Sequence, residues 1–188
     1  PILNKKSMIL KLHSYIYIIK RKLNGFLQDC FIKSRMTKGS VLPELKGPIY
    51  WNANNVKIGK NVTLYPGVYL SGQNIEIEDN VKIGYGTIIY SKKRVKIGRN
   101  TIIAAQCYII DSNHGISLDS LIQEQELEVA EEGITIGEDV WIASQCSIIK
   151  GAHIHNHAVI GANSLVNKEI PENAIAFGTP AKVSSYRV

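Results

Sequence analysis

The sequence predicts an all-β fold, a parallel β-solenoid whose short strands wind around a three-sided core. Large aliphatic residues recur at every sixth position, small or β-branched residues lie four positions after most of them, and each break in this register falls after the third side of a coil. An α-helix needs apolar spacings of three and four, which a period of six does not supply. A basic amphipathic helical segment is expected in front of the solenoid.

The aliphatic repeat occupies fifteen positions, of which twelve are isoleucine, two are leucine and one is valine. These positions are Ile58, Leu64, Leu70, Ile77, Ile83, Ile89, Ile97, Ile103, Ile109, Ile136, Ile142, Ile148, Ile154, Ile160 and Val166. Three successive positions make one coil, and a single coil cannot bury its own apolar face, so the coils must stack. Stacked parallel strands lie about 4.8 Å apart, which aligns the repeat into three interior columns.

The residues four positions after the aliphatic ones are expected to fill the narrow corners of each coil. They are Val62, Val68, Val81, Thr87, Thr101, Cys107, Val140, Cys146, Ala152, Ala158 and Ser164. Cys107 and Cys146 hold equivalent places in consecutive coils, so we expect them to stack at one inner corner. Small buried thiols fill tight space more often than they act as nucleophiles.

The breaks in register predict where a binding face lies. One extra residue follows Leu70, two follow Ile89 and twenty-one follow Ile109. All three breaks share one vertical edge of the solenoid, and insertions on one face of a repeat protein often build its binding face. The longest insertion is the loop at residues 115–133, which holds six of the sixteen acidic residues. A loop of this length is usually functional or disordered. We expect it to reach toward a neighbouring subunit, and the alternative is an acidic loop that is merely solvated.

Residues 1–46 form a separate basic segment. They carry ten Lys and Arg against two acidic residues, a net charge of +8, whereas the remaining 142 residues carry a net charge of −2. Apolar residues at spacings of three and four from about Ser7 to Ile32 predict an amphipathic helix. Such a helix can lie on an anionic membrane surface or pack on its own oligomer, and both remain open. The predicted solenoid follows at residues 47–170, and a C-terminal tail at 171–188.

The composition also excludes several classes of protein. The net positive charge is confined to residues 1–46, which argues against a nucleic-acid-binding protein. The longest apolar run near the start, residues 15–19, is too short to span a bilayer, and no cleavage site follows it, so we expect no signal peptide. The three cysteines show no CxxC spacing and predict neither a disulfide framework nor a zinc module, which favours a cytoplasmic location.

The repeats themselves resemble a known family. The segments at residues 58–62, 97–101 and 136–142 look like the hexapeptide-repeat acyltransferases, and the resemblance covers about residues 47–183. It implies a left-handed parallel β-helix, an exception to the usual right-handed crossover. It also implies a homotrimer with active sites between subunits.

One short motif is similar to the sugar, maltose and galactoside O-acetyltransferase branch of that family. The string Asp111-Ser-Asn-His114 matches the Asp-x-Asn-His element of that branch, in which the histidine is the general base. Histidine titrates near neutrality, so it can take the proton of an acceptor hydroxyl and release it again. The resemblance assigns this role to His114. It places Asn113 and Asp111 beside the acceptor, and Asp111 could also fix the tautomer of His114.

The C-terminal half resembles the same family in the order and spacing of its motifs. In the family, acetyl-CoA lies in a groove between adjacent subunits, held by the backbone of these coils and by nearby basic residues. Matched position by position, the resemblance implicates Trp141, Ser144, Ala162, Asn167, Lys168 and Lys182 in binding acetyl-CoA. The family often has threonine at position 167 and arginine at position 182. For Trp141, packing at a trimer contact remains an equal alternative.

These observations predict an acetyltransferase that moves an acetyl group from acetyl-CoA to a sugar hydroxyl of a surface polysaccharide or its precursor. Two alternatives remain open. One is an acetyltransferase for an amino sugar nucleotide or another small acceptor, and the other is a metal-dependent or non-catalytic trimeric β-helix protein. His153, His155 and His157 suggest zinc, but the register puts them on different sides and corners. Zinc needs ligands that converge at about 2.0–2.1 Å, so we expect no metal site.

Overall fold

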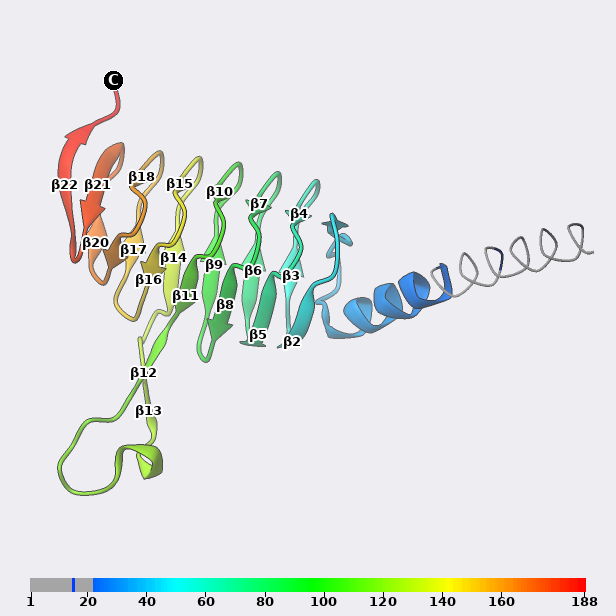
Figure 1. The fold of residues 1–188 in the computed structure, drawn as a ribbon, viewed down its shortest axis with the longest axis horizontal. Helices are drawn as coiled ribbons and strands as arrows, with labels where there is room; N and C mark the ends of the chain where they lie inside the picture. The colour runs from blue at the N-terminus through cyan, green and yellow to red at the C-terminus, as the bar shows by residue number, and fades with distance from the viewer. Residues whose placement is uncertain (1–14, 16–21) are drawn as a thin grey trace, which may run out of the picture. The chain divides into compact units, whose positions relative to one another are not determined.

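The computed structural model describes Tyr15 and residues 22–188 (Figure 1). The chain divides into two compact units, residues 1–34 and 35–188, and each is described by itself. In the first unit residues 22–34 are helical, which confirms the described part of the predicted helix; the part from Ser7 to Arg21, apart from Tyr15, lies outside the described residues. No helix among the described residues is long and apolar enough to cross a membrane.

The second unit is the predicted solenoid, a left-handed parallel β-helix of about seven turns with three sheets. Each sheet is named here after its first strand. The β1 sheet consists of β1 (Glu44–Leu45), β4 (Thr63–Leu64), β7 (Lys82–Ile83), β10 (Ile102–Ile103), β15 (Trp141–Ile142), β18 (Val159–Ile160), β21 (Ala174–Gly178) and β22 (Ala181–Tyr186). The β2 sheet consists of β2 (Tyr50–Asn54), β5 (Tyr69–Gln73), β8 (Ile88–Ser91), β11 (Tyr108–Ile110), β16 (Ser147–Ile148) and β19 (Leu165–Val166). The β3 sheet consists of β3 (Lys57–Ile58), β6 (Ile75–Ile77), β9 (Val95–Ile97), β14 (Ile134–Ile136), β17 (His153–Ile154) and β20 (Glu169–Ile170).

The core of the solenoid is the predicted set of aliphatic columns. All fifteen repeat positions are at most 2% exposed, and so are the eleven corner residues. The register stacks equivalent positions directly, as with Ile83, Ile103 and Ile142 in the β1 sheet. Full burial of one such side chain contributes about 1.5–3 kcal/mol. The columns are therefore the main source of stability, and the interior carries no polar group at these fifteen places.

The ends of the solenoid extend the predicted range. The parallel pairing begins before residue 47, with a bridge between Met36 and Val56 and with β1 against β4. Within residues 171–188, β21 is the last parallel strand, and β22 turns back antiparallel to it. The last coil adds the buried residues Ile170 and Ala176 to the interior columns.

One corner of the coils is lined by residues with positive φ. They are Asn61, Asn80, Asn100, Asp139, His157 and Asn173, with φ between 51° and 61°. Asparagine tolerates this left-handed conformation better than most residues. In the first coils the amides form a ladder, since Asn61 Nδ2 donates to Asn80 Oδ1 at 3.1 Å and Asn80 Nδ2 donates to Asn100 Oδ1 at 3.0 Å.

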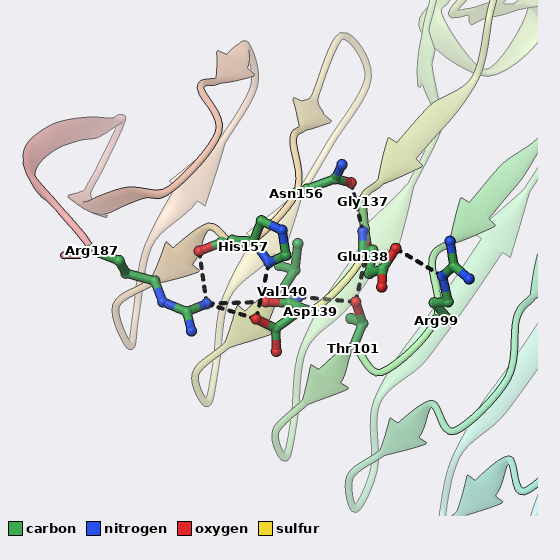
Figure 2. A network of polar contacts seen from close by, with 9 residues as sticks. All are labelled: Arg99, Thr101, Gly137, Glu138, Asp139, Val140, Asn156, His157 and Arg187. Atoms are coloured by element: carbon green, nitrogen blue, oxygen red, sulfur yellow. Dashed lines mark hydrogen bonds and ion pairs between the residues drawn. The ribbon is translucent and has the colours of Figure 1, made fainter.

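In the later coils charged groups replace this ladder, as Figure 2 shows. Asp139 Oδ2 lies 3.1 Å from His157 Nδ1 and accepts a hydrogen bond from Arg187 Nη1, also at 3.1 Å. Arg187 Nη1 donates as well to the carbonyl oxygen of His157 at 3.0 Å. The hydrogen bonds from His157 and Arg187 lower the pKa of Asp139. This group, the Asp139 clamp, joins the end of the chain to two successive coils.

The predicted long loop is a hairpin arm that leaves the solenoid between β11 and β14 (Figure 1). In it β12 (Ser112–His114) pairs antiparallel with β13 (Leu127–Val129), and the 3-10 helix η1 (Ile122–Glu124) lies near its far end. Its base is on the edge between the β2 and β3 sheets, where the other two insertions also fall, so the predicted common edge is confirmed. Gly133 has φ +75°, and a Cβ there would lie 2.0 Å from the carbonyl oxygen of Arg94. Only glycine fits where the arm rejoins the solenoid.

Candidate active site

Asp111 lies at the base of the arm and is completely buried. Its Oδ1 accepts a hydrogen bond from the backbone N–H of Lys92 at 2.7 Å, and its Oδ2 accepts from the N–H groups of Lys93 and Arg94, both at 2.8 Å. The hydroxyl of Ser91 lies 3.4 Å from Oδ2. A buried carboxylate is tolerated only when hydrogen bonds replace its hydration. The Asp111 carboxylate therefore holds residues 92–94, the insertion of one coil, against the start of the arm in the following coil.

These contacts place Asp111 differently from the expectation that it fixes the tautomer of His114. Among the described residues no hydrogen bond joins the two side chains, and both carboxylate oxygens of Asp111 are used by residues 91–94. Asp111 therefore positions the strand that carries His114, since β12 begins at the next residue.

Asn113 and His114 are consecutive residues of β12, and both are exposed. His114 pairs with Leu127 in the hairpin register, and Asn113 pairs with Glu128. Both residues line a pocket of about 580 Å³, within the size range of small-molecule sites. Tyr90, Tyr108 and Ile110 contribute from the β2 sheet, and Ser112, Gln123, Glu124, Gln125, Glu126 and Leu127 contribute from the arm.

Ser112 is a pocket residue that the sequence interpretation did not single out. It is 2% exposed, and its Oγ is the one buried side-chain oxygen or nitrogen among the described residues without a hydrogen-bond partner. Leaving such a hydroxyl unpaired costs about 1–3 kcal/mol. Residues two apart in a strand share a face, so Ser112 and His114 lie on the same face of the hairpin. Ser112 is therefore an unpaired buried polar group among the residues that line the pocket.

Hydrogen bonds within the arm fix the wall of the pocket. At the base, the N–H of Ala130 donates to the carbonyl of Asp111 at 3.1 Å. Lys150 of the following coil pairs with Glu128 at 2.7 Å. Further out, Gln125 Oε1 accepts from the N–H of Ser117 at 2.9 Å, and Gln125 Nε2 donates to the carbonyl of Ser117 at 2.8 Å. The arm is therefore an ordered element that can hold His114 in a defined place.

The six residues that the resemblance implicates in acetyl-CoA binding lie in four places. Trp141 is 53% exposed on the outer face of the β1 sheet, where its register neighbours are Ile102 and Val159. Ser144 and Ala162 lie in successive coils at the corner between the β1 and β2 sheets. The remaining residues are Asn167 and Lys168 at the corner of the arm, and Lys182 on β22. One chain does not gather all six residues at one corner.

The two solenoid cysteines stack at one inner corner, as predicted. Both are 1% exposed, and each thiol points to a carbonyl of the following coil, with Cys107 Sγ 3.2 Å from Ala143 O and Cys146 Sγ 3.1 Å from Gly161 O. The hydrogen bond to Cys146 and burial raise the pKa of the Cys107 thiol. The hydrogen bond with Cys107 lowers the pKa of the Cys146 thiol to about 7. Both thiols are almost wholly buried, which suits small packing groups.

Two of the three histidines of residues 153–157 have carboxylate partners of their own. His155 Nε2 lies 2.7 Å from Glu169 Oε1, His157 belongs to the Asp139 clamp, and His153 is on β17. The part of the chain that the structure describes contains no group of three His, Cys, Asp or Glu side chains that could hold a metal ion.

Comparison with known proteins supports the hexapeptide repeat. Residues 133–168 match the family model described as bacterial transferase hexapeptide (six repeats). A galactoside O-acetyltransferase of Lactococcus lactis subsp. lactis (strain IL1403) is 58% identical over 33 residues, which are 18% of this chain and 16% of the relative. The predicted resemblance is thereby confirmed, and the matched segment spans about a sixth of that relative's length.

Solved structures show a similar fold. A mutant of AntD, an N-acyltransferase from Bacillus cereus, was solved with dTDP-4-amino-4,6-dideoxyglucose and coenzyme A. It has a TM-score of 0.68 and 19% identity, over 86% of this chain and 89% of that chain. A maltose O-acetyltransferase from Clostridium difficile 630 has a TM-score of 0.51 and 25% identity, over 82% of this chain and 71% of that chain.

Proposed function

We propose that this chain, which carries the hexapeptide repeat of bacterial transferases, moves an acetyl group from acetyl-CoA to a sugar hydroxyl with His114 as the general base. The position of His114 carries the proposal. It lines a pocket at the edge where the insertions gather, on a strand held in place by the buried Asp111. The acceptor belongs to a surface polysaccharide or its precursor.

The reaction needs one proton to move twice. The imidazole of His114 takes the proton of the acceptor hydroxyl while the hydroxyl oxygen bonds to the carbonyl carbon of the thioester. The tetrahedral intermediate then collapses, the carbon–sulfur bond breaks, and the imidazolium returns the proton to the departing thiolate. The unpartnered hydroxyl of Ser112 lies on the same face of the hairpin and can donate to an oxygen of the acceptor or of the intermediate.

Acetyl-CoA is the proposed donor because similar folds were solved with coenzyme A or an acyl-CoA. We assign its binding to Trp141, Ser144, Ala162, Asn167, Lys168 and Lys182. These residues lie at more than one corner, which fits a donor that lies between two subunits. Exposed lysines such as Lys168 and Lys182 suit the phosphates of the cofactor.

The arm supports a homotrimer. Its far end exposes four large aliphatic side chains, Ile116, Leu118, Leu121 and Ile122. A contiguous exposed apolar patch commonly marks a protein contact. We propose that these residues pack against a second copy of the chain. The membrane contact of residues 1–46 stays a prediction.

Thiol release from acetyl-CoA in the presence of pooled sugars tests the reaction. Loss of a general base typically costs about 10²–10⁴-fold in rate. We therefore expect His114→Ala to lose acceptor-dependent release while it stays folded and still binds coenzyme A. The matched control is His155→Ala, an exposed histidine outside the pocket. Equal rates for wild type and His114→Ala would refute the assigned base, and a wild type that neither binds nor consumes acetyl-CoA would refute the transferase.

A second acceptor class has support from one comparison. AntD was solved with an amino sugar nucleotide, and its fold covers 86% of this chain. The alternative is therefore transfer to the amine of an amino sugar nucleotide. Parallel assays with hydroxyl and amine acceptors separate the two. If only the amine acceptor is acetylated, the acceptor is an amino sugar nucleotide and not a sugar hydroxyl.

A further inference from the structure

The outer face of the β2 sheet differs from the rest of the solenoid in charge. Its six strands contain no Asp, Glu, Lys or Arg. The β3 sheet exposes or half-exposes Lys57, Glu76, Lys96 and Glu169 at its outward positions, and 20% of the whole chain is charged. The six strands on one long side of the described solenoid therefore carry no charged side chain.

Tyrosines replace the charges on this face. The register aligns Tyr50, Tyr69, Ile88 and Tyr108 in one outward column across β2, β5, β8 and β11. Tyr50 is 65% exposed and Tyr108 is 40% exposed. The rings of Tyr50 and Tyr69 meet edge to face, with centroids 6.2 Å apart. Tyrosine offers a flat apolar ring and a polar hydroxyl and loses little conformational entropy when it binds.

This column leads into the candidate active site. Tyr108 and Tyr90 line the pocket that also holds His114. From β11 the column continues through β8 and β5 to β2, a distance of about 14 Å at the usual strand spacing. The column thus runs from the pocket along one face of the solenoid, and Ser112, whose hydroxyl has no partner, also lines the pocket.

We propose that this face binds a neutral oligosaccharide, which lies along the tyrosine column and presents one hydroxyl to His114. The proposal rests on the proposed function and specifies its acceptor as a chain of several sugars. Sugar rings have apolar faces that pack on tyrosine rings and hydroxyls that exchange hydrogen bonds with polar side chains such as the exposed Asn52. A polyanionic chain or a nucleotide would need cations, and the strands of this sheet supply none.

Calorimetric titration of the full chain with two pairs of neutral probes tests the proposal. The pairs are maltose with maltoheptaose and cellobiose with cellohexaose. We expect the longer member of at least one pair to bind about tenfold tighter than its disaccharide. Tyr69→Ala and Tyr50→Ala should each reduce this preference and leave disaccharide binding unchanged. The control is Tyr85→Ala, an exposed tyrosine at a corner that packs on Tyr65 and lies outside the column.

Three results would overturn the proposal. One is the absence of any length preference in both pairs, and another is a preference that persists in both column variants. The third is a smaller assembly in sedimentation for Tyr50→Ala, because the face would then be a contact between copies of the chain.

The test separates this proposal from the proposed function. In His114→Ala, transfer should disappear while the length preference in binding remains. A wild type that prefers long chains but transfers no acetyl group would keep the binding face and refute the transferase. A wild type that acetylates disaccharides but shows no length preference in binding would support the transferase and refute the binding face.

Discussion

At the scale of single residues, Asp111 shows how a candidate site can depend on a fully buried group. Its carboxylate accepts hydrogen bonds from three backbone N–H groups of the preceding coil, directly before the first residue of β12. Asp111→Asn keeps one acceptor oxygen but turns an amide NH₂ toward N–H donors. Because buried donors then lose their partners, we expect the free energy of unfolding to fall by about 1–3 kcal/mol, with a lower transfer rate.

Urea unfolding followed by tryptophan fluorescence measures this effect. Asp119→Asn is the matched control, since Asp119 is an exposed acid on the arm that accepts a hydrogen bond from the hydroxyl of Ser117. Equal unfolding midpoints for Asp111→Asn and wild type would show that the buried carboxylate is dispensable.

The Asp139 clamp predicts a pH-dependent contribution to stability. His157 and Arg187 hold the folded pKa of Asp139 below its usual value. The contribution is therefore present above the unfolded pKa of about 3.9 and is lost as the pH falls through the lower folded value. It is small, because the side chain is half exposed. Thermal unfolding should show a lower midpoint for Asp139→Asn than for wild type at pH 6, and nearly equal midpoints well below pH 3. A gap that stays constant with pH would contradict this.

At the scale of elements, the base and the far end of the arm differ in their contacts. Its base carries His114 and is tied to the following coil through Glu128 and Lys150, whereas its far end exposes aliphatic side chains. Leu118 is fully exposed, so Leu118→Glu should leave the fold of one chain intact and weaken its assembly. Sedimentation velocity should then show species smaller than the wild-type assembly. Ser120→Glu, on the same arm, is the control, and an unchanged assembly for Leu118→Glu would refute the contact.

At the scale of the whole molecule, the structural features that the sequence predicts are those that follow from its six-residue period. The aliphatic columns and the small corner residues follow from a period of six, so the inward positions from Ile58 to Val166 can be assigned by counting along the chain. The common edge of the insertions follows from the same count. The partners of Asp111 could not be predicted, because they are amides 17 to 19 residues away in another coil. The unpaired hydroxyl of Ser112 depends on packing around the arm, and no repeat specifies it.

The return of β22 along β21 has a consequence for how the protein behaves in concentrated solution. A parallel solenoid ends in open strand edges, and such edges can recruit the same edge of another molecule and grow into fibres. Here the last parallel strand, β21, pairs with the antiparallel β22, and Arg187 of the Asp139 clamp holds the segment after β22 in place. The other two sheets end in strands of only two residues, β19 and β20, which offer little to pair with. Since β22 is itself the edge strand of the β1 sheet, another strand could pair at this end of the solenoid only along the edge of β22.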